Sequence, residues 1–94
     1  MAKFAVVTTV ELPEGETIEN GRQQLETNII PMIKQAPGFV SAVFVPDPNS
    51  REGLSVVVFE NKDQAQFASD NMTSQMPPNI KLKKTEVREV AASV

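Results

Sequence analysis

The chain has 94 residues, no cysteine and no histidine, and nine basic against twelve acidic residues give a net charge of −3. This is the length of one domain, residues 1–94. The composition excludes a disulfide framework, thiolate chemistry and imidazole ligation, so we expect neither a metal nor a cofactor. The acidic balance argues against a nucleic-acid partner.

The amino-terminal residues do not have the pattern of a secretory signal. One lysine precedes a short apolar run that Thr8 and Thr9 interrupt, whereas a signal needs a longer apolar stretch. Nowhere do about 18 apolar residues follow one another, as a membrane span requires. The sequence therefore predicts a cytoplasmic protein with no membrane partner.

The first third of the chain predicts a strand and a helix. Residues 3–10 (KFAVVTTV) are rich in β-branched residues, which favour strands. Thr17 is a candidate N-cap for a helix over residues 18–30, because apolar residues then recur at three- and four-residue spacing. Pro31 lacks a backbone donor and should kink this helix, with a further turn to Gln35 before Pro37-Gly38 ends it.

The remainder predicts a hairpin, a helix and a last strand. Residues 39–45 (FVSAVFV) and 54–59 (LSVVVF) read as strands joined by a turn over residues 46–53. Asn61 is a candidate cap of the second helix, with Gln64 as its capping-box partner and Pro77-Pro78 as its stop. In the last strand, residues 80–92, the apolar positions change parity, which predicts a bulge near residues 83–85.

The order βαββαβ predicts an α+β, ferredoxin-like fold, a four-stranded antiparallel sheet with two helices on one face. The other face of the sheet would be polar in a monomer. In these strands, however, both faces are apolar: Leu54, Val56 and Val58 alternate with Val57 and Phe59, and Val40, Ala42 and Phe44 alternate with Phe39, Val43 and Val45. The open face therefore predicts a homodimer with sheet packed on sheet. The alternative is a monomer whose carboxyl-terminal tail covers that face.

Several short features together carry a family resemblance. They are Pro37-Gly38-Phe39 after the first helix, Phe59 at the end of the third strand, the capped, alanine-containing helix that follows, and Val87-Arg88-Glu89-Val90. On these the chain resembles the antibiotic biosynthesis monooxygenase-like superfamily of dimeric α+β barrels. The resemblance implies a barrel made of two sheets, with a small-molecule pocket between sheet and helices of each subunit.

The departures from that superfamily bear on activity. Its enzymes commonly carry a tryptophan and a histidine where Phe59 and Ala68 stand here, and its haem-degrading branch needs a histidine ligand. The sequence therefore favours a non-catalytic protein that binds a small apolar or aromatic molecule. The alternatives are a cofactor-independent monooxygenase or isomerase and a protein-interaction module.

Candidate ligand-binding residues are polar or aromatic side chains in apolar segments, although no catalytic pair is specified. They are Asn28, Phe39, Ser41, Ser55, Phe59 and Asn71. The third strand is also similar to that of the RNA-recognition motif, but Leu54 and Val56 stand where that module stacks bases on aromatic rings. Asp47-Pro48-Asn49-Ser50 is interpreted as a turn rather than a calcium loop, because the downstream acidic ligand is missing.

Overall fold

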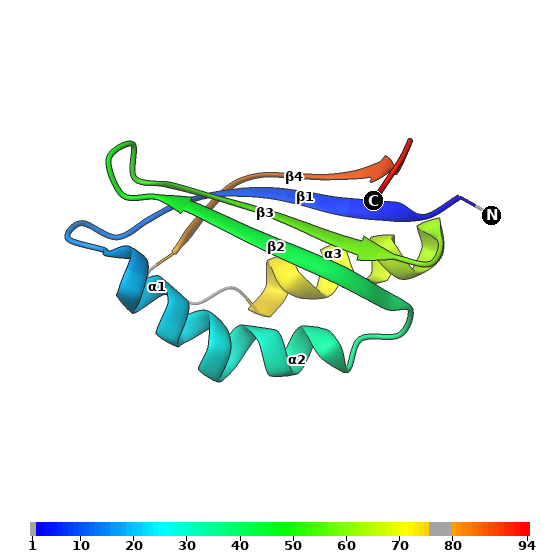
Figure 1. The fold of residues 1–94 in the computed structure, drawn as a ribbon, viewed down its shortest axis with the longest axis horizontal. Coiled ribbons are helices and arrows are strands. Elements are labelled where there is room, and N and C mark those ends of the chain that lie inside the picture. Colours follow the sequence, from blue (N-terminus) through cyan, green and yellow to red (C-terminus); the bar gives the residue numbers. More distant parts are fainter. Residues whose placement is uncertain (1, 76–79) are drawn as a thin grey trace.

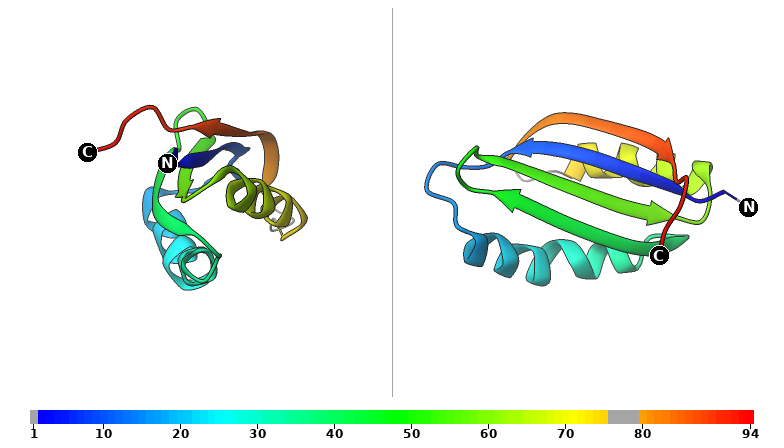
Figure 2. Two further views of the ribbon diagram at one scale, coloured as in Figure 1. Left: turned by 90° about the vertical axis from the view of Figure 1, so that its right-hand side faces the viewer. Right: turned by 45° about the horizontal axis from the view of Figure 1, so that its top comes forward.

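The computed structural model describes residues 2–75 and 80–94 and has the expected α+β, ferredoxin-like fold (Figure 1). Four antiparallel strands form one sheet in the order β2-β3-β1-β4. The helices lie on one face of this sheet and leave the other face open (Figure 2). The elements are β1 (Phe4–Glu11), α1 (Ile18–Gln24), η1 (Leu25–Ile29), α2 (Ile30–Lys34), β2 (Phe39–Asp47), β3 (Glu52–Phe59), α3 (Lys62–Gln75) and β4 (Lys81–Glu89).

The first helical segment runs through α1, η1 and α2 and has the expected cap. Thr17 Oγ1 accepts a hydrogen bond of 3.1 Å from Asn20 N. The kink expected at Pro31 takes the form of a π-helical turn, η1, directly before it. Proline cannot donate to the carbonyl four residues back, and the wider π turn, in which Ile30 N bonds to Leu25 O, accommodates that missing bond. The segment ends at Lys34 with Gln35 as its C-cap, one residue before the predicted end.

The core lies between β1, β3 and α3. Val6, Val57, Phe59 and Ala65 are buried together. Asn61 Oδ1 accepts a 2.9 Å bond from Gln64 N, so the predicted cap of α3 is present. The other half of the predicted capping box is absent among the described residues, because Gln64 Oε1 is buried without a hydrogen-bond partner. The expected stop at Pro77-Pro78 lies outside the described residues.

In β2 the alternation of faces differs from the sequence-based expectation. Phe39 pairs with Phe59, whereas Ser41 already pairs with Val58, so Val40 is an extra residue that forms a bulge. The bulge places Phe39 on the helix-covered face with Ala42, and not on the face opposite to it. Phe39 there packs edge-on against Phe59, with ring centroids 6.4 Å apart and planes at 79°.

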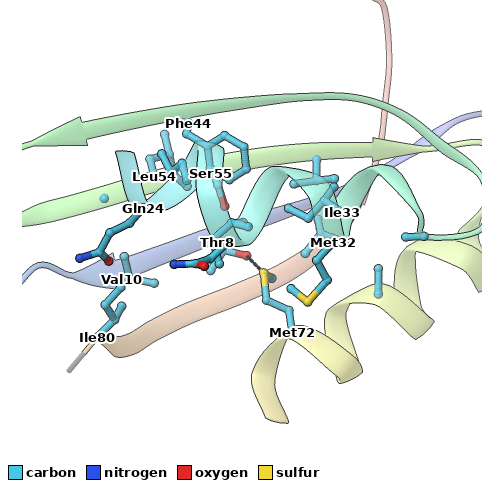
Figure 3. Close-up of a pocket in the computed structure, with 18 of the residues that line it drawn as sticks. Thr8, Val10, Gln24, Met32, Ile33, Phe44, Leu54, Ser55, Met72 and Ile80 are labelled. Carbon is cyan, nitrogen blue, oxygen red and sulfur yellow. Dashed lines mark hydrogen bonds between the residues drawn. The ribbon is translucent and has the colours of Figure 1, made fainter. Parts of the chain in front are cut away.

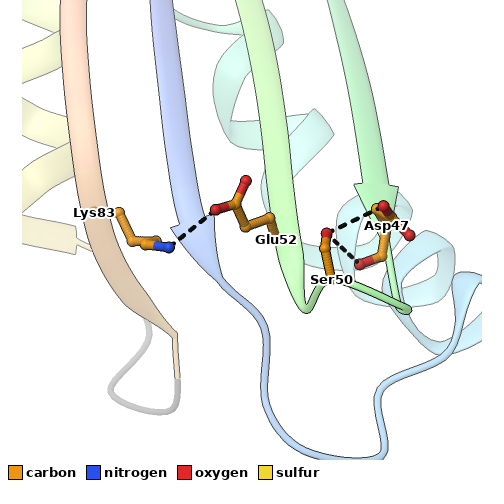
Figure 4. Close-up of polar contacts among 4 residues, drawn as sticks. All are labelled: Asp47, Ser50, Glu52 and Lys83. Carbon is orange, nitrogen blue, oxygen red and sulfur yellow. Dashed lines mark hydrogen bonds and ion pairs between the residues drawn. The ribbon is translucent and has the colours of Figure 1, made fainter.

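The hairpin end of the sheet is held by polar contacts (Figure 4). Asp47 accepts hydrogen bonds from Asn49 N and from the Ser50 hydroxyl, both of 3.1 Å, which confirms the predicted turn. Lys83 Nζ reaches across β1 to Glu52 Oε2 at 2.9 Å. The pairing of β4 with β1 shifts register at Thr9/Val10, where Lys83 is the extra residue. The bulge predicted near residues 83–85 is therefore confirmed.

The open face is apolar on its β2–β3 side and charged on β4. Val43, Val45 and Leu54 alternate with core residues and are 58%, 53% and 42% exposed. The tail residues 91–94 are themselves exposed, so the tail does not cover this part of the face. On β4, Glu86 pairs with both Lys84 and Arg88.

Alanine substitution at two glycines should change the free energy of unfolding in opposite directions. Gly38 has φ +79° and lies against the Gln64 side chain, whereas Gly21 lies in α1, where an alanine Cβ would meet no atom within 4 Å. Gly38→Ala should lower the free energy of unfolding by about 1–3 kcal/mol, and Gly21→Ala should raise it by about 0.5–1 kcal/mol. Urea unfolding of both variants measures the difference, and equal shifts would contradict the backbone described here.

Candidate ligand cavity

A cavity of about 420 Å³ lies between the sheet and the two helical segments that cover it, α1–η1–α2 and α3 (Figure 3). Its floor is the helix-covered face of β1 and β3, one wall is α1–η1–α2, and the other is α3; toward the hairpin it also borders Leu54. Most of its lining is apolar, including Leu25, Ile29, Ile33, Phe44, Ala68 and Met72. Ligand sites of small molecules have volumes of roughly 300–1,000 Å³ and a similar lining.

The cavity exists because the two helical segments contact different parts of the sheet. The contacts of α3 are with β1, β3 and β4, whereas α1 approaches β2. Small residues at Gly53, Ser55 and Ala68 leave the space between them unfilled. Met32 and Phe67 line the cavity and are also exposed, so the cavity opens between the two helical segments. It also borders the exposed Val45 and Leu54 near the hairpin.

The structure brings four of the six predicted residues to this cavity. Asn28 reaches it from η1, Ser55 and Phe59 from β3, and Asn71 from α3. Phe39 does not line it and packs behind Phe59. Ser41 is exposed on the open face, paired with Val58. Ser41 lies there because it alternates with Ala42, which packs on the core, whereas the bulge at Val40 turns only Phe39 to the helix-covered face, where it meets Phe59.

Thr8 is a lining residue that sequence reasoning did not select. It is 2% exposed, and its Oγ1 lies 3.3 Å from Thr85 Oγ1 and 4.0 Å from Met72 Sδ (Figure 3). Ser69 Oγ lies 3.5 Å from Thr85 Oγ1 and extends this set of hydroxyls beneath α3. The sequence does indicate the position of Thr8 through the alternation of side chains along a strand. Thr8 shares a strand face with Phe4, Val6 and Val10, so it is a polar residue on a core-facing row.

Charged groups lie mostly away from the cavity. Among the described lining residues only Glu16 is charged, and its Oε1 accepts a 3.2 Å bond from Thr17 N. Hydrogen bonds from Lys84 and Arg88 lower the pKa of Glu86, and a hydrogen bond to Glu52 raises the pKa of Lys83. Both titrating groups are on β4, outside the cavity lining. The polar chemistry of the cavity is therefore mainly that of uncharged hydroxyls and amides.

No protein-family model matches the chain, and no curated protein shows significant sequence similarity to it. Over residues 2–75 and 80–94, no three histidine, cysteine or carboxylate side chains gather as metal ligands would. In the same part of the chain, every helix is too short or too polar to cross a membrane.

Proposed function

We propose that the protein binds a small apolar or aromatic molecule in the cavity between α1–η1–α2 and α3, without catalysing a reaction. The observation that carries this proposal is a space of about 420 Å³ walled mainly by apolar side chains and open between the helices. An apolar ligand would gain roughly 25 cal/mol for each Å² of its surface removed from water. The proposed location is the cytoplasm.

We also propose that two copies associate through their open faces and that the chain belongs to the antibiotic biosynthesis monooxygenase-like superfamily. Support for association comes from the exposed Val43, Val45 and Leu54. A two-fold axis places this apolar strip against its own copy and leaves the Glu86 charge pairs at the rim. Association would cover Val45 and Leu54, which border the cavity near the hairpin, and would leave the opening at Met32 and Phe67 free.

A titration with 2-naphthol tests the binding proposal. The chain contains neither tryptophan nor tyrosine, so the fluorescence of a naphthalene ring is observed without a protein background. We expect saturable binding with one site per chain and no oxygen consumption by the mixture. Linear, unsaturable partition of naphthol into the protein would contradict the proposal. Steady oxygen uptake would instead assign a cofactor-independent oxygenase.

A further inference from the structure

A row of hydroxyl groups crosses the helix-covered face of the sheet, and two of its members, Thr8 and Ser55, line the cavity floor. Thr8 in β1 pairs with Thr85 in β4 on one side and with Ser55 in β3 on the other, so the three side chains lie abreast on the helix-covered face. We call them the hydroxyl row. The neighbouring row on this face is apolar, with Val6 between Val57 and Val87. Polar atoms are thus confined to one level of the floor.

The hydrogen-bonding capacity of this row is only partly used. Thr8 is held by Thr85 and by Met72 Sδ, and a thioether is a weak acceptor. Within the described residues no group bonds the Ser55 hydroxyl, although Ser55 lines the cavity. The side-chain amides of Asn28 and Asn71, which line the walls above, have no hydrogen-bond partner there either. Asn28 is exposed and Ser55 and Asn71 are half-buried, so solvent reaches these groups, and a ligand with a polar group of its own can replace that water with a direct hydrogen bond.

The charges of the cavity determine what kind of polar group fits. Its described lining includes no lysine or arginine, and the carboxylate of Glu16 stands at one end. An anionic ligand would lose its hydration without gaining a counter-charge. Hydroxyls and amides, by contrast, both donate to a carbonyl and accept from a hydroxyl.

Granted the proposed function, we propose that the ligand is an uncharged molecule with an apolar ring body and a hydroxyl or carbonyl group that hydrogen-bonds to Thr8 and Ser55 in the hydroxyl row. The row then selects neutral polar ligands over both hydrocarbons and anions of the same shape. Such selection arises because the wrong ligand leaves either a protein group or its own charge unsatisfied.

Three probes of one ring system separate these cases: naphthalene, 2-naphthol and 2-naphthoate. We expect 2-naphthol to bind most tightly to the wild-type protein. Thr8→Val and Ser55→Ala should each weaken 2-naphthol binding roughly three- to tenfold, the worth of one neutral hydrogen bond, and leave naphthalene binding unchanged. Thr9→Val is the matched control, because Thr9 faces away from the cavity and pairs with Leu54. Circular dichroism checks that each variant is folded, and Ser55→Ala serves as the test should Thr8→Val unfold.

The outcomes distinguish this inference from the proposed function. If naphthalene and 2-naphthol bind equally and neither variant changes the difference, the hydroxyl row is not a recognition element although the cavity binds ligands. An equal loss for both probes would show a structural role only and would also overturn the inference. Tighter binding of 2-naphthoate would overturn the selection for uncharged ligands. If none of the probes binds, the proposed function fails first and the inference with it.

Discussion

Val56→Asp is expected to turn the proposed homodimer into a folded monomer. Val56 pairs with Val43 at the open face, opposite to the core-facing Val57. In a dimer its side chain would be covered by the partner, and burying an unpaired carboxylate costs several kcal/mol. Because 1.4 kcal/mol is a factor of ten in affinity, the dissociation constant should rise at least about a hundredfold. Light scattering at micromolar concentration measures the change as a halving of the mass.

The neighbouring substitution Val57→Asp is the internal comparison. Val57 is 3% exposed and packs in the core with Val6 and Phe59. A charge at this position should unfold the chain and replace its circular dichroism spectrum with that of a coil, whereas Val56→Asp should keep the spectrum of the wild type. The assembly proposal is contradicted by a wild-type protein that scatters as a monomer, or by a Val56→Asp protein that remains a dimer.

Ala68→Phe is expected to close the cavity. Ala68 is half-buried on α3 and lines the space opposite η1, which is large enough to hold a phenyl ring in place of a ligand. A ligand would then have to displace that ring, and overpacking of this kind costs roughly 1–3 kcal/mol, or about a ten- to hundredfold loss of affinity. Fluorescence titration with 2-naphthol measures the loss.

Gln66→Phe controls for the added ring, because Gln66 is exposed on the same helix and does not line the cavity. This variant should bind 2-naphthol as the wild type does. Ala68→Phe should also keep its fold, and its thermal midpoint should be near that of the wild type or above it, since filled cavities tend to stabilise. Undiminished binding by a folded Ala68→Phe protein would place the ligand elsewhere.

Much of the fold could be predicted because local signals agreed with one another. Thr17 and Asn61 cap the two helical segments through hydrogen bonds that their residue type makes common. The change of parity in the last strand correctly located the bulge at Lys83. In each of these cases the physical cause lies within a few residues of its effect.

The candidate site was harder to predict because it depends on strand alignment. No residue of β2 signals the bulge at Val40, which turns Phe39 toward the helices. Ser41 lies on the open face because it alternates with Ala42 and Phe44, and which face of the strand the helices cover depends on the packing of the whole sheet. Parity alone places Thr8 on the core-facing side of β1, but its place in a polar row follows only from its pairing with Ser55 and Thr85. The π turn at η1, which presents Asn28 to the cavity, likewise depends on how the chain accommodates Pro31.

Methyl NMR of protein labelled with ¹³C at methionine and valine shows where on the molecule a small ligand binds. Met32 and Met72 line the cavity from α2 and α3, whereas Val43 lies on the open face. On addition of 2-naphthol, the Met32 and Met72 methyl resonances should shift saturably, and that of Val43 should stay in place. Saturable shifts confined to Val43, or none at Met32 and Met72, would contradict the account.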